Sequence, residues 1–296
     1  MGEAVIIADA GGTKTQWLFY PSFTEDEEGV MIVTQGINAA VMSRETIADR
    51  IQDLYAKINS IKPDIMSCRL YFYGAGCNSE PIILRLNQAF AENFPITLTT
   101  EEYYSDIVGA AHALFGRDEG VVCILGTGSA SGIYDGKSLI DSIPSLGFIL
   151  GDEGSGAFMG KTLLNMAYKR ELPNNIKEKL EESYGLDLPS VIENVYRKPN
   201  ANRYLASFVP FIKENEHIGE ISGMIDYSLK LFFEKNVLKY KKLPNKTLRF
   251  AGGVASLFSD RIVRIANEHG LKADRFIQNP IFELSEYHLK ENFLKI

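Results

Sequence analysis

Short apolar runs separated by turn-forming residues open the chain and predict three β-strands in succession. These runs cover residues 5–8, 16–20 and 30–34. A glycine-rich turn joins the first strand to the second, and an acidic turn at residues 25–29 joins the second to the third. Connections this short favour antiparallel pairing, so the chain is expected to begin with an antiparallel sheet.

The pattern then changes to helical spacing, which alternates with further strands. After Ser43 a set of apolar residues recurs every three or four positions and indicates one buried face of a helix. The set is Ile47, Ile51, Leu54, Tyr55 and Ile58. Strand 69–73, helix 81–93, strand 96–99 and helix 105–115 follow. The order βββαβαβα predicts an α/β fold in which parallel strands joined by crossover helices extend the antiparallel start.

The same opening recurs in the second half of the chain. Strand 121–125, a glycine-rich turn, strand 129–134 and a third strand at 137–140 repeat the first order. Helices 202–215 and 218–243, strand 247–250, a helix after Gly253, a strand near 272–277 and an amphipathic helix 282–293 complete the chain. A chain of 296 residues exceeds the usual size of one domain. We therefore expect two related domains, residues 1–117 with 281–296, and residues 118–280.

Charge and apolar content exclude several classes of function. The net charge is −7 with acidic and basic residues interspersed, whereas nucleic-acid binding usually needs a basic stripe. No apolar stretch approaches the length that spans a bilayer, and the apolar run near the N-terminus is too short for a signal peptide. We expect a cytoplasmic protein that binds neither nucleic acid nor membrane.

Cysteines and histidines give no sign of a metal site. Cys68, Cys77 and Cys123 lie far apart without a C-x-x-C pair, which is typical of buried thiols in a reducing compartment. The histidines share no ligand-like spacing, and ordinary surface or helix positions are expected for all four. They are His112, His217, His269 and His288.

Two glycine-rich turns are candidates for binding phosphate. The first holds Gly11, Gly12 and Thr13 after Asp9, and the second runs through Gly126, Thr127, Gly128 and Ser129. Because glycine has no Cβ, backbone N–H groups in such turns approach a phosphate closely, and hydroxyls add further donors. Each turn taken alone also fits a tight hairpin, for which glycine is common. Their recurrence at the same place in both halves favours a polyphosphate gripped from two sides.

A third glycine pair and two rejected motifs complete the search for nucleotide sites. Gly252 and Gly253 follow a predicted strand and open a helix, which permits close approach of a base or ribose, or close helix–strand packing. The triplet 160–162 resembles the end of a P-loop, but Ser155 stands where its glycine is required. No G-x-G-x-x-G opens a βαβ unit either.

The three glycine sites, in this order, resemble the phosphate-1, phosphate-2 and adenosine motifs of the sugar-kinase, actin and heat-shock-chaperone superfamily. Residues 146–155 are similar to the G-x-x-x-G-D-E-G-S segment of the N-acetylglucosamine kinase branch, which belongs to the BadF/BadG/BcrA/BcrD ATPase family. The resemblance covers essentially the whole chain. It implies two actin-like (ribonuclease H-like) ATPase domains with a nucleotide cleft between them, and ATP and Mg²⁺ as cofactors.

The same resemblance implies roles for individual residues. Asp106, in the segment 99–110, matches the catalytic base, and Asp9 is placed near Mg²⁺ through water. The residues matched to the sugar site are Asn38, Gly74, Gly76, Gly147 and Asp152. The implied activity is transfer of phosphate from ATP to an N-acetylhexosamine, at its 6-hydroxyl, by a homodimer.

Departures from the family pattern leave the sugar open. Ala130 replaces the Asn that follows the second turn in acetylglucosamine kinases, Leu146 replaces a Trp, and Cys77 stands where a polar residue is expected. N-acetylglucosamine and relatives such as N-acetylmuramic acid both remain. The alternative is an ATPase of the same fold that acts as a regulator or as the activator of a redox enzyme, although no cysteine pair suits an iron–sulfur cluster.

Overall fold

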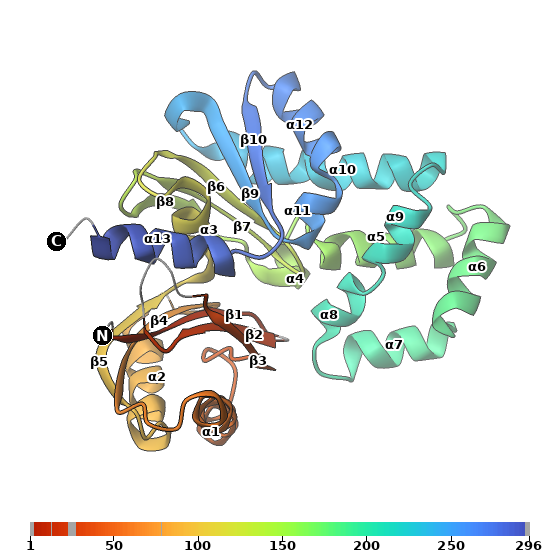
Figure 1. The fold of residues 1–296 in the computed structure, drawn as a ribbon. Helices are drawn as coiled ribbons and strands as arrows, with labels where there is room; N and C mark the ends of the chain where they lie inside the picture. The colour runs from red at the N-terminus through yellow and green to blue at the C-terminus, as the bar shows by residue number, and fades with distance from the viewer. Residues whose placement is uncertain (1–2, 13, 23–27, 78, 294–296) are drawn as a thin grey trace. The chain divides into compact units, whose positions relative to one another are not determined.

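The computed structural model describes residues 3–12, 14–22, 28–77 and 79–293. The chain divides into two compact units, the first made of Met1–Gly116 with Asn279–Ile296 and the second of Arg117–Gln278. Each unit contains one five-stranded sheet together with helices (Figure 1). The predicted α/β class is confirmed. No helix in the described part of the chain is long and apolar enough to cross a bilayer.

The sheet of the first unit has the strand order β3-β2-β1-β4-β5. Its strands are β1 (Ala4–Ala10), β2 (Lys14–Tyr20), β3 (Val30–Gln35), β4 (Ser67–Gly74) and β5 (Thr97–Tyr104). The pairs β1–β2 and β2–β3 are antiparallel, and the pairs β1–β4 and β4–β5 are parallel. The predicted order of elements in this half is therefore confirmed. β5 is longer than expected, so Glu101 and Glu102 lie on a strand and not in a loop.

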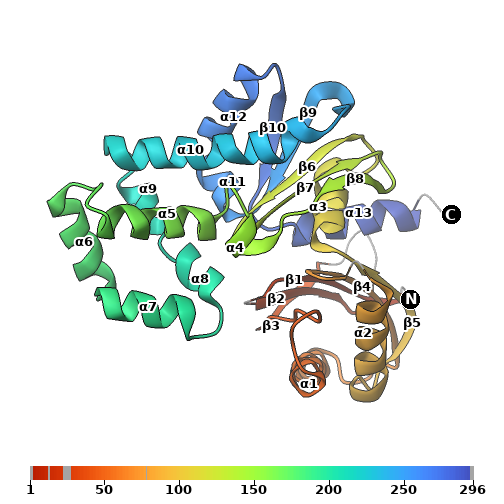
Figure 2. The same ribbon diagram turned by 180° about the vertical axis from the view of Figure 1, so that it is seen from behind.

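Four helices cover the two faces of this sheet. They are α1 (Arg44–Ile61), α2 (Glu80–Asn93), α3 (Asp106–Phe115) and α13 (Ile281–Phe293). The first two lie on one face, and α3 and α13 lie on the other (Figure 1 and Figure 2). Ser43 and Ser105 begin α1 and α3 by accepting backbone N–H groups of the first turn through their hydroxyls, the usual N-cap arrangement. The C-terminal helix α13 contacts α3, β1 and β2.

The sheet of the second unit repeats the topology of the first. Its strands are β6 (Gly120–Leu125), β7 (Ser129–Tyr134), β8 (Leu139–Ile143), β9 (Thr247–Ala251) and β10 (Lys272–Ile277). The order is β10-β9-β6-β7-β8, again with an antiparallel start and two parallel additions. The internal repeat seen in the sequence is thus a repeat of sheet topology.

The helices of the second unit correct two predictions. They are α4 (Gly147–Leu150), α5 (Gly156–Tyr168), α6 (Asn174–Tyr184), α7 (Leu188–Tyr196), α8 (Ala201–Ala206), α9 (Val209–Glu214), α10 (Gly219–Lys235), α11 (Gly253–Leu257) and α12 (Ser259–Glu268). The single helix expected at 202–215 is wrong because Pro210, which lacks an N–H, is tolerated only in the first turn of a new helix, α9. The helix expected at 218–243 stops at Lys235.

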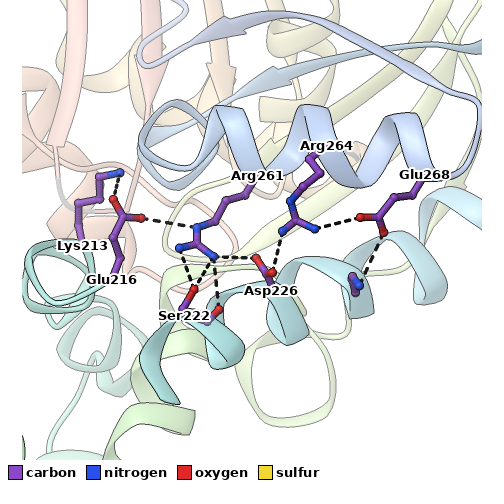
Figure 3. Close-up of polar contacts among 8 residues, drawn as sticks. Lys213, Glu216, Ser222, Asp226, Arg261, Arg264 and Glu268 are labelled. Atoms are coloured by element: carbon purple, nitrogen blue, oxygen red, sulfur yellow. Dashed lines mark hydrogen bonds and ion pairs between the residues drawn. The ribbon is translucent and has the colours of Figure 1, made fainter. Parts of the chain in front are cut away.

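An ion-pair cluster fastens α12 to α10 in the second unit (Figure 3). Arg261 on α12 donates to Asp226 at 2.8 Å and to the Ser222 hydroxyl at 3.1 Å. Arg264 donates to the same Asp226 carboxylate at 2.6 Å and to Glu268 at 2.9 Å. Burial alone would raise the pKa of Asp226, but its two arginine partners outweigh this effect and lower it. Because α12 follows α11 directly, the cluster also holds the segment that contains Gly252 and Gly253.

We expect Asp226→Asn to destabilise the protein at pH 7 by about 1–3 kcal/mol, because two arginines lose a shared charged acceptor. A carboxyl with a lowered folded-state pKa adds stability above its unfolded pKa, and this stability is lost as the pH falls through the folded-state pKa. The difference between wild type and variant should therefore shrink below about pH 4. Denaturant unfolding at both pH values measures this.

The matched control is Glu193→Gln, which removes only the exposed pair with Arg197 on α7. Exposed pairs of this kind are worth about 0–1 kcal/mol. Equal losses in the two variants, or a loss at Asp226 that does not change with pH, would contradict the role given to the cluster.

Candidate active site

The turn between β1 and β2 is shaped by a glycine from another part of the first unit. Gly11 donates its N–H to the Lys14 carbonyl at 3.1 Å. Gly36, just after β3, lies against this turn so closely that a Cβ there would overlap the Gly11 carbonyl oxygen and lie 2.5 Å from the Gly12 carbonyl carbon. Sequence reasoning missed this supporting role, for which a glycine directly after the third strand was the available signal. Thr13 lies outside the described residues.

Asp9, near the end of β1, lies close enough to Asp106 for their charges to repel. The pKa of Asp9 is raised to about 6, first by burial, then by Asp106, and Lys14 opposes the rise. Asp106 is the first residue of α3, and one of its carboxylate oxygens accepts the N–H of Ile107 at 2.9 Å. Protein atoms around this carboxyl replace part of its hydration and raise its pKa, although the side chain remains accessible to solvent. The structure therefore places a potential proton acceptor beside a second carboxylate.

Two short segments meet near these carboxylates. Gly76 has φ +85°, and a Cβ there would lie 2.8 Å from the Ala40 Cβ and 3.6 Å from the Asn38 side-chain oxygen. That oxygen accepts the Ala40 N–H at 3.1 Å. The pKa of Cys77 is raised to about 12 by burial and then by the charge of Asp106. The loop from Gly74 to Cys77 thus connects the Asn38 turn with the carboxylates, and the first unit gathers the sugar-site residues predicted there.

Arg85 on α2 stabilises the turn that contains Asn38. Its guanidinium donates to the Ala39 carbonyl at 2.8 Å and to the Met42 carbonyl. The backbone N–H groups of Val41 and Met42 both return to the Asn38 carbonyl. Since the Asn38 side-chain oxygen also accepts the Ala40 N–H, the group that remains for an outside partner, among the described contacts, is the side-chain NH₂.

The turn between β6 and β7 is held by the start of α5. The carbonyls of Gly126 and Thr127 accept the N–H groups of Gly156 at 2.8 Å and Ala157 at 3.1 Å. Gly126 in turn donates its own N–H to the Gly128 carbonyl at 3.0 Å. Within the described part of the chain, the N–H groups of Thr127 and Gly128 have no protein acceptor. They are the two donors that the tip of this turn offers to an anion.

Asp152 lies against this same turn. One of its carboxylate oxygens accepts the Ser129 N–H at 3.2 Å, and a Cβ at Gly128 would lie 3.1 Å from the other. Gly128 therefore lets the carboxylate reach the turn. Burial raises the pKa of Asp152, while the Ser129 N–H and Lys161 oppose the rise. Because the Ser129 N–H is already used inside the unit, the phosphate role predicted for Ser129 rests on its hydroxyl.

The segment that leads to Asp152 contains an unusual run of backbone conformations. Leu146 has φ +61°, Gly147 +70° and Asp152 +56°. The left-handed region is costly for residues other than glycine, and such residues cluster at ligand-binding sites. Lys161 on α5 fixes the segment by donating to the Phe148 carbonyl at 3.1 Å. The sugar roles predicted for Gly147 and Asp152 remain predictions.

The third glycine site adjoins the second turn. Gly252 has φ 111° and ψ 158°, a region open only to glycine. A Cβ there would overlap the Leu125 carbonyl oxygen and lie 3.2 Å from the Gly126 nitrogen. Gly253, by contrast, has no neighbour within 4 Å of its Cβ position and begins α11. Gly252 thus lets the predicted adenosine motif approach the base of the predicted phosphate turn.

Neither the described acidic and histidine side chains nor the cysteines form a metal-binding cluster. Among the residues that the structure describes, no group of three or more His, Cys, Asp or Glu side chains is arranged to hold a metal ion. Cys68, Cys77 and Cys123 are buried free thiols, as predicted.

Comparison with known proteins gives structural relatives only. No family model and no curated protein matches the chain. A candidate N-acetylglucosamine kinase from Porphyromonas gingivalis is 34% identical, with a TM-score of 0.89 over 97% of this chain and 99% of that one. A candidate N-acetylglucosamine kinase from Chromobacterium violaceum is 16% identical, with a TM-score of 0.74 over 97% and 99%. A non-polymerising variant of MamK bound to AMPPNP is 12% identical, with a TM-score of 0.50 over 98% of each chain.

Adjacent glycines provide a test of this geometry. We expect Gly252→Ala to destabilise the protein by about 1–3 kcal/mol or more, because alanine cannot adopt its backbone conformation without strain. Gly253→Ala should be neutral or slightly stabilising, since its Cβ meets open space in a helical position. Thermal unfolding of both variants measures the contrast, and equal midpoints would show that the close approach at Gly252 is absent in solution.

Proposed function

The chain belongs to the N-acetylglucosamine kinase-like family within the sugar-kinase, actin and heat-shock-chaperone superfamily, and from this premise we propose that it is an ATP-dependent kinase that phosphorylates an N-acetylhexosamine at the 6-hydroxyl. The observation that carries the proposal is the group of Asp9, Asp106 and the loop from Gly74 to Cys77 in the first unit. It combines a potential general base with a small-residue loop and a glycine turn.

The proposal assigns the phosphates of ATP to the two glycine turns. At the second turn, the backbone N–H groups of Thr127 and Gly128 are available to bind phosphate. At the first turn, the close approach of Gly36 shapes the backbone at Gly12, which is assigned to phosphate as well. MamK, which shares the fold, binds the ATP analogue AMPPNP in its structure. The adenosine is assigned to Gly252 and Gly253, beside the second turn.

The carboxylates of the first unit fit a magnesium ion that accompanies ATP. Mg²⁺ usually takes one or two protein carboxylates and completes its octahedron with phosphate oxygens and water, so a cluster of three protein ligands is not needed. Asp9 is the residue that would hold it, directly or through water. Burial and then repulsion from Asp106 raise the pKa of Asp9, and a nearby cation would offset both effects. When bound, the ion would neutralise charge on the phosphates.

Asp106 has the environment of a general base. A carboxyl with a raised pKa is a stronger proton acceptor, and this one remains accessible to a substrate. In the proposed step the sugar hydroxyl oxygen attacks the γ-phosphorus as its proton passes to Asp106. The bond between the γ-phosphorus and the β–γ bridging oxygen breaks, and ADP leaves with the electron pair. The protein contributes by positioning the sugar hydroxyl in line with the γ-phosphorus and the leaving oxygen, with the base within reach of the hydroxyl proton.

The alternative function as a redox-enzyme activator has less support. Such a role would need accessible cysteines to bind an iron–sulfur cluster. Cys68, Cys77 and Cys123 are all buried, and burial raises the pKa of each thiol. The proposal therefore keeps the kinase function, in a cytoplasmic homodimer. It leaves open which N-acetylhexosamine is the substrate, N-acetylglucosamine or a relative such as N-acetylmuramic acid.

The test is a coupled assay of ADP release with ATP and Mg²⁺ over a panel of sugars. We expect N-acetylglucosamine, N-acetylmannosamine or N-acetylmuramic acid to raise the rate well above the sugar-free rate, and glucose to raise it less. The 6-deoxy form of the best substrate should inhibit without being phosphorylated, because it retains the contacts but lacks the attacking oxygen. If no sugar accelerates ADP release, the proposed function is wrong. A 6-deoxy sugar that still accepts phosphate would move the reaction to another hydroxyl.

A further inference from the structure

Tyr73, the residue before Gly74 on β4, is packed against the helix that presents Asp106. Its side chain is 1% exposed. A Cβ at Gly109 would lie 2.9 Å from a ring carbon of Tyr73, closer than real Cβ atoms come. Gly109 lies about one helical turn after Asp106. The helix can therefore approach Tyr73 this closely only because position 109 is glycine, which gives a physical reason for the Asp-x-x-Gly spacing.

The same ring also packs against the strand that leads into the helix. Tyr104, the last residue of β5, is the register partner of Tyr73 in the sheet. Their rings are stacked, with centroids 5.0 Å apart and planes 18° apart. Only Ser105, the N-cap of α3, separates Tyr104 from Asp106. Tyr73 thus contacts the chain on both sides of Asp106.

The hydroxyl of Tyr73 joins two buried histidines. It lies 2.9 Å from Nδ1 of His112 on α3 and 2.8 Å from Nε2 of His288 on α13. Both histidines lie on helices, which is one of the two positions expected for them, but His112 is 5% exposed and His288 is 4% exposed, so neither lies at the surface. A phenol has one proton to donate, so it donates to one imidazole and accepts an N–H from the other when both rings are neutral. The chain of hydrogen bonds therefore links β4, α3 and α13.

Aromatic rings enclose this chain on several sides. The ring of Tyr287 stacks on His112 at 4.2 Å, and the ring of Tyr71 stacks on His288 at 3.7 Å. Burial lowers the pKa of His112 to about 4, which keeps it neutral near pH 7. An enclosed, hydrogen-bonded network has few alternative arrangements, so it fixes the distance between α3 and the sheet.

We infer that Tyr73 is a positioning residue for the Asp106 carboxylate. Its ring sets how closely the start of α3 approaches the sheet, and its hydroxyl fixes the helix through His112 while His288 anchors the pair from α13. The inference rests on the proposed function, in which Asp106 is the base. A base displaced by about 1 Å can lose about 10²-fold in rate without losing its substrate.

The test compares Tyr73→Phe with Tyr20→Phe. Tyr73→Phe keeps the ring against Gly109 and Tyr104 but removes both hydrogen bonds to histidine. We expect kcat to fall about 10–10²-fold, with KM for sugar and ATP within a few-fold of wild type. Tyr20→Phe removes a buried hydroxyl contact of similar kind, to Ser285 on α13 at 2.6 Å, and should leave kcat near wild type.

Substitutions at His112 test the same hydrogen bond from its other partner, without a change at Tyr73. Asn can place an amide group near the position of Nδ1, whereas Leu cannot form the hydrogen bond. His112→Leu should therefore reproduce the kcat loss of Tyr73→Phe, and His112→Asn should recover most of it. If Leu and Asn variants of equal thermal stability have equal kcat, the hydrogen bond does not position the base and the inference is overturned.

Asp106→Asn, measured beside these variants, distinguishes a failure of the role given to Tyr73 from a failure of the role given to Asp106. An inactive Asp106→Asn with near-native Tyr73→Phe would overturn the inference and leave the proposed function standing. Near-native turnover of Asp106→Asn would show that the base lies elsewhere, which overturns the inference while kinase activity itself remains, and the sugar panel tests that activity separately. Equal kcat losses in Tyr73→Phe and Tyr20→Phe would show that the hydroxyl contributes only to general stability, which also overturns the inference.

Discussion

In each unit, the candidate site depends on backbone segments that approach one another too closely for a Cβ. Gly36 shapes the first glycine turn, Gly128 admits Asp152 to the second, and Gly252 brings the third site against the second. Gly109 does the same for the helix that carries Asp106. Glycines in a turn leave backbone N–H donors accessible to an anion. A glycine at the point of contact allows a second segment to pack closely against that turn.

The carboxylates near these turns have raised pKa values because burial outweighs the nearby positive charges and N–H donors. Asp9 and Asp106 repel each other, and Asp152 is buried against the Ser129 N–H group with Lys161 as a favourable charge. Such an arrangement lowers stability unless a ligand compensates, which is common where stability is exchanged for function. Positive charge near Asp9 and Asp106 in the first unit, and an anion at the N–H donors of the second unit, would each offset part of this cost.

Local patterns were enough to predict most elements but not the contacts between them. Apolar runs placed most strands and helices correctly, and Ser43 marked the start of α1, because both signals are short-range. The break before α9 depended on Pro210, which was outweighed by the helical spacing around it. The Tyr73–His288 hydrogen bond spans 215 positions, and no spacing rule reaches so far. Family resemblance supplied the residue roles, whereas only the structure showed which backbone groups support them.

The most direct measurement of the central claim is kcat of Asp106→Asn with both substrates saturating, beside Glu101→Gln. Asparagine keeps the shape of the side chain but accepts no proton, so turnover should fall by about 10²–10⁴-fold. Glu101 lies on β5 nearby in sequence, bonded to the Tyr103 hydroxyl at 3.0 Å, and its substitution should change kcat by no more than a few-fold. Turnover of Asp106→Asn close to that of wild type would contradict the account, because the base would then lie elsewhere.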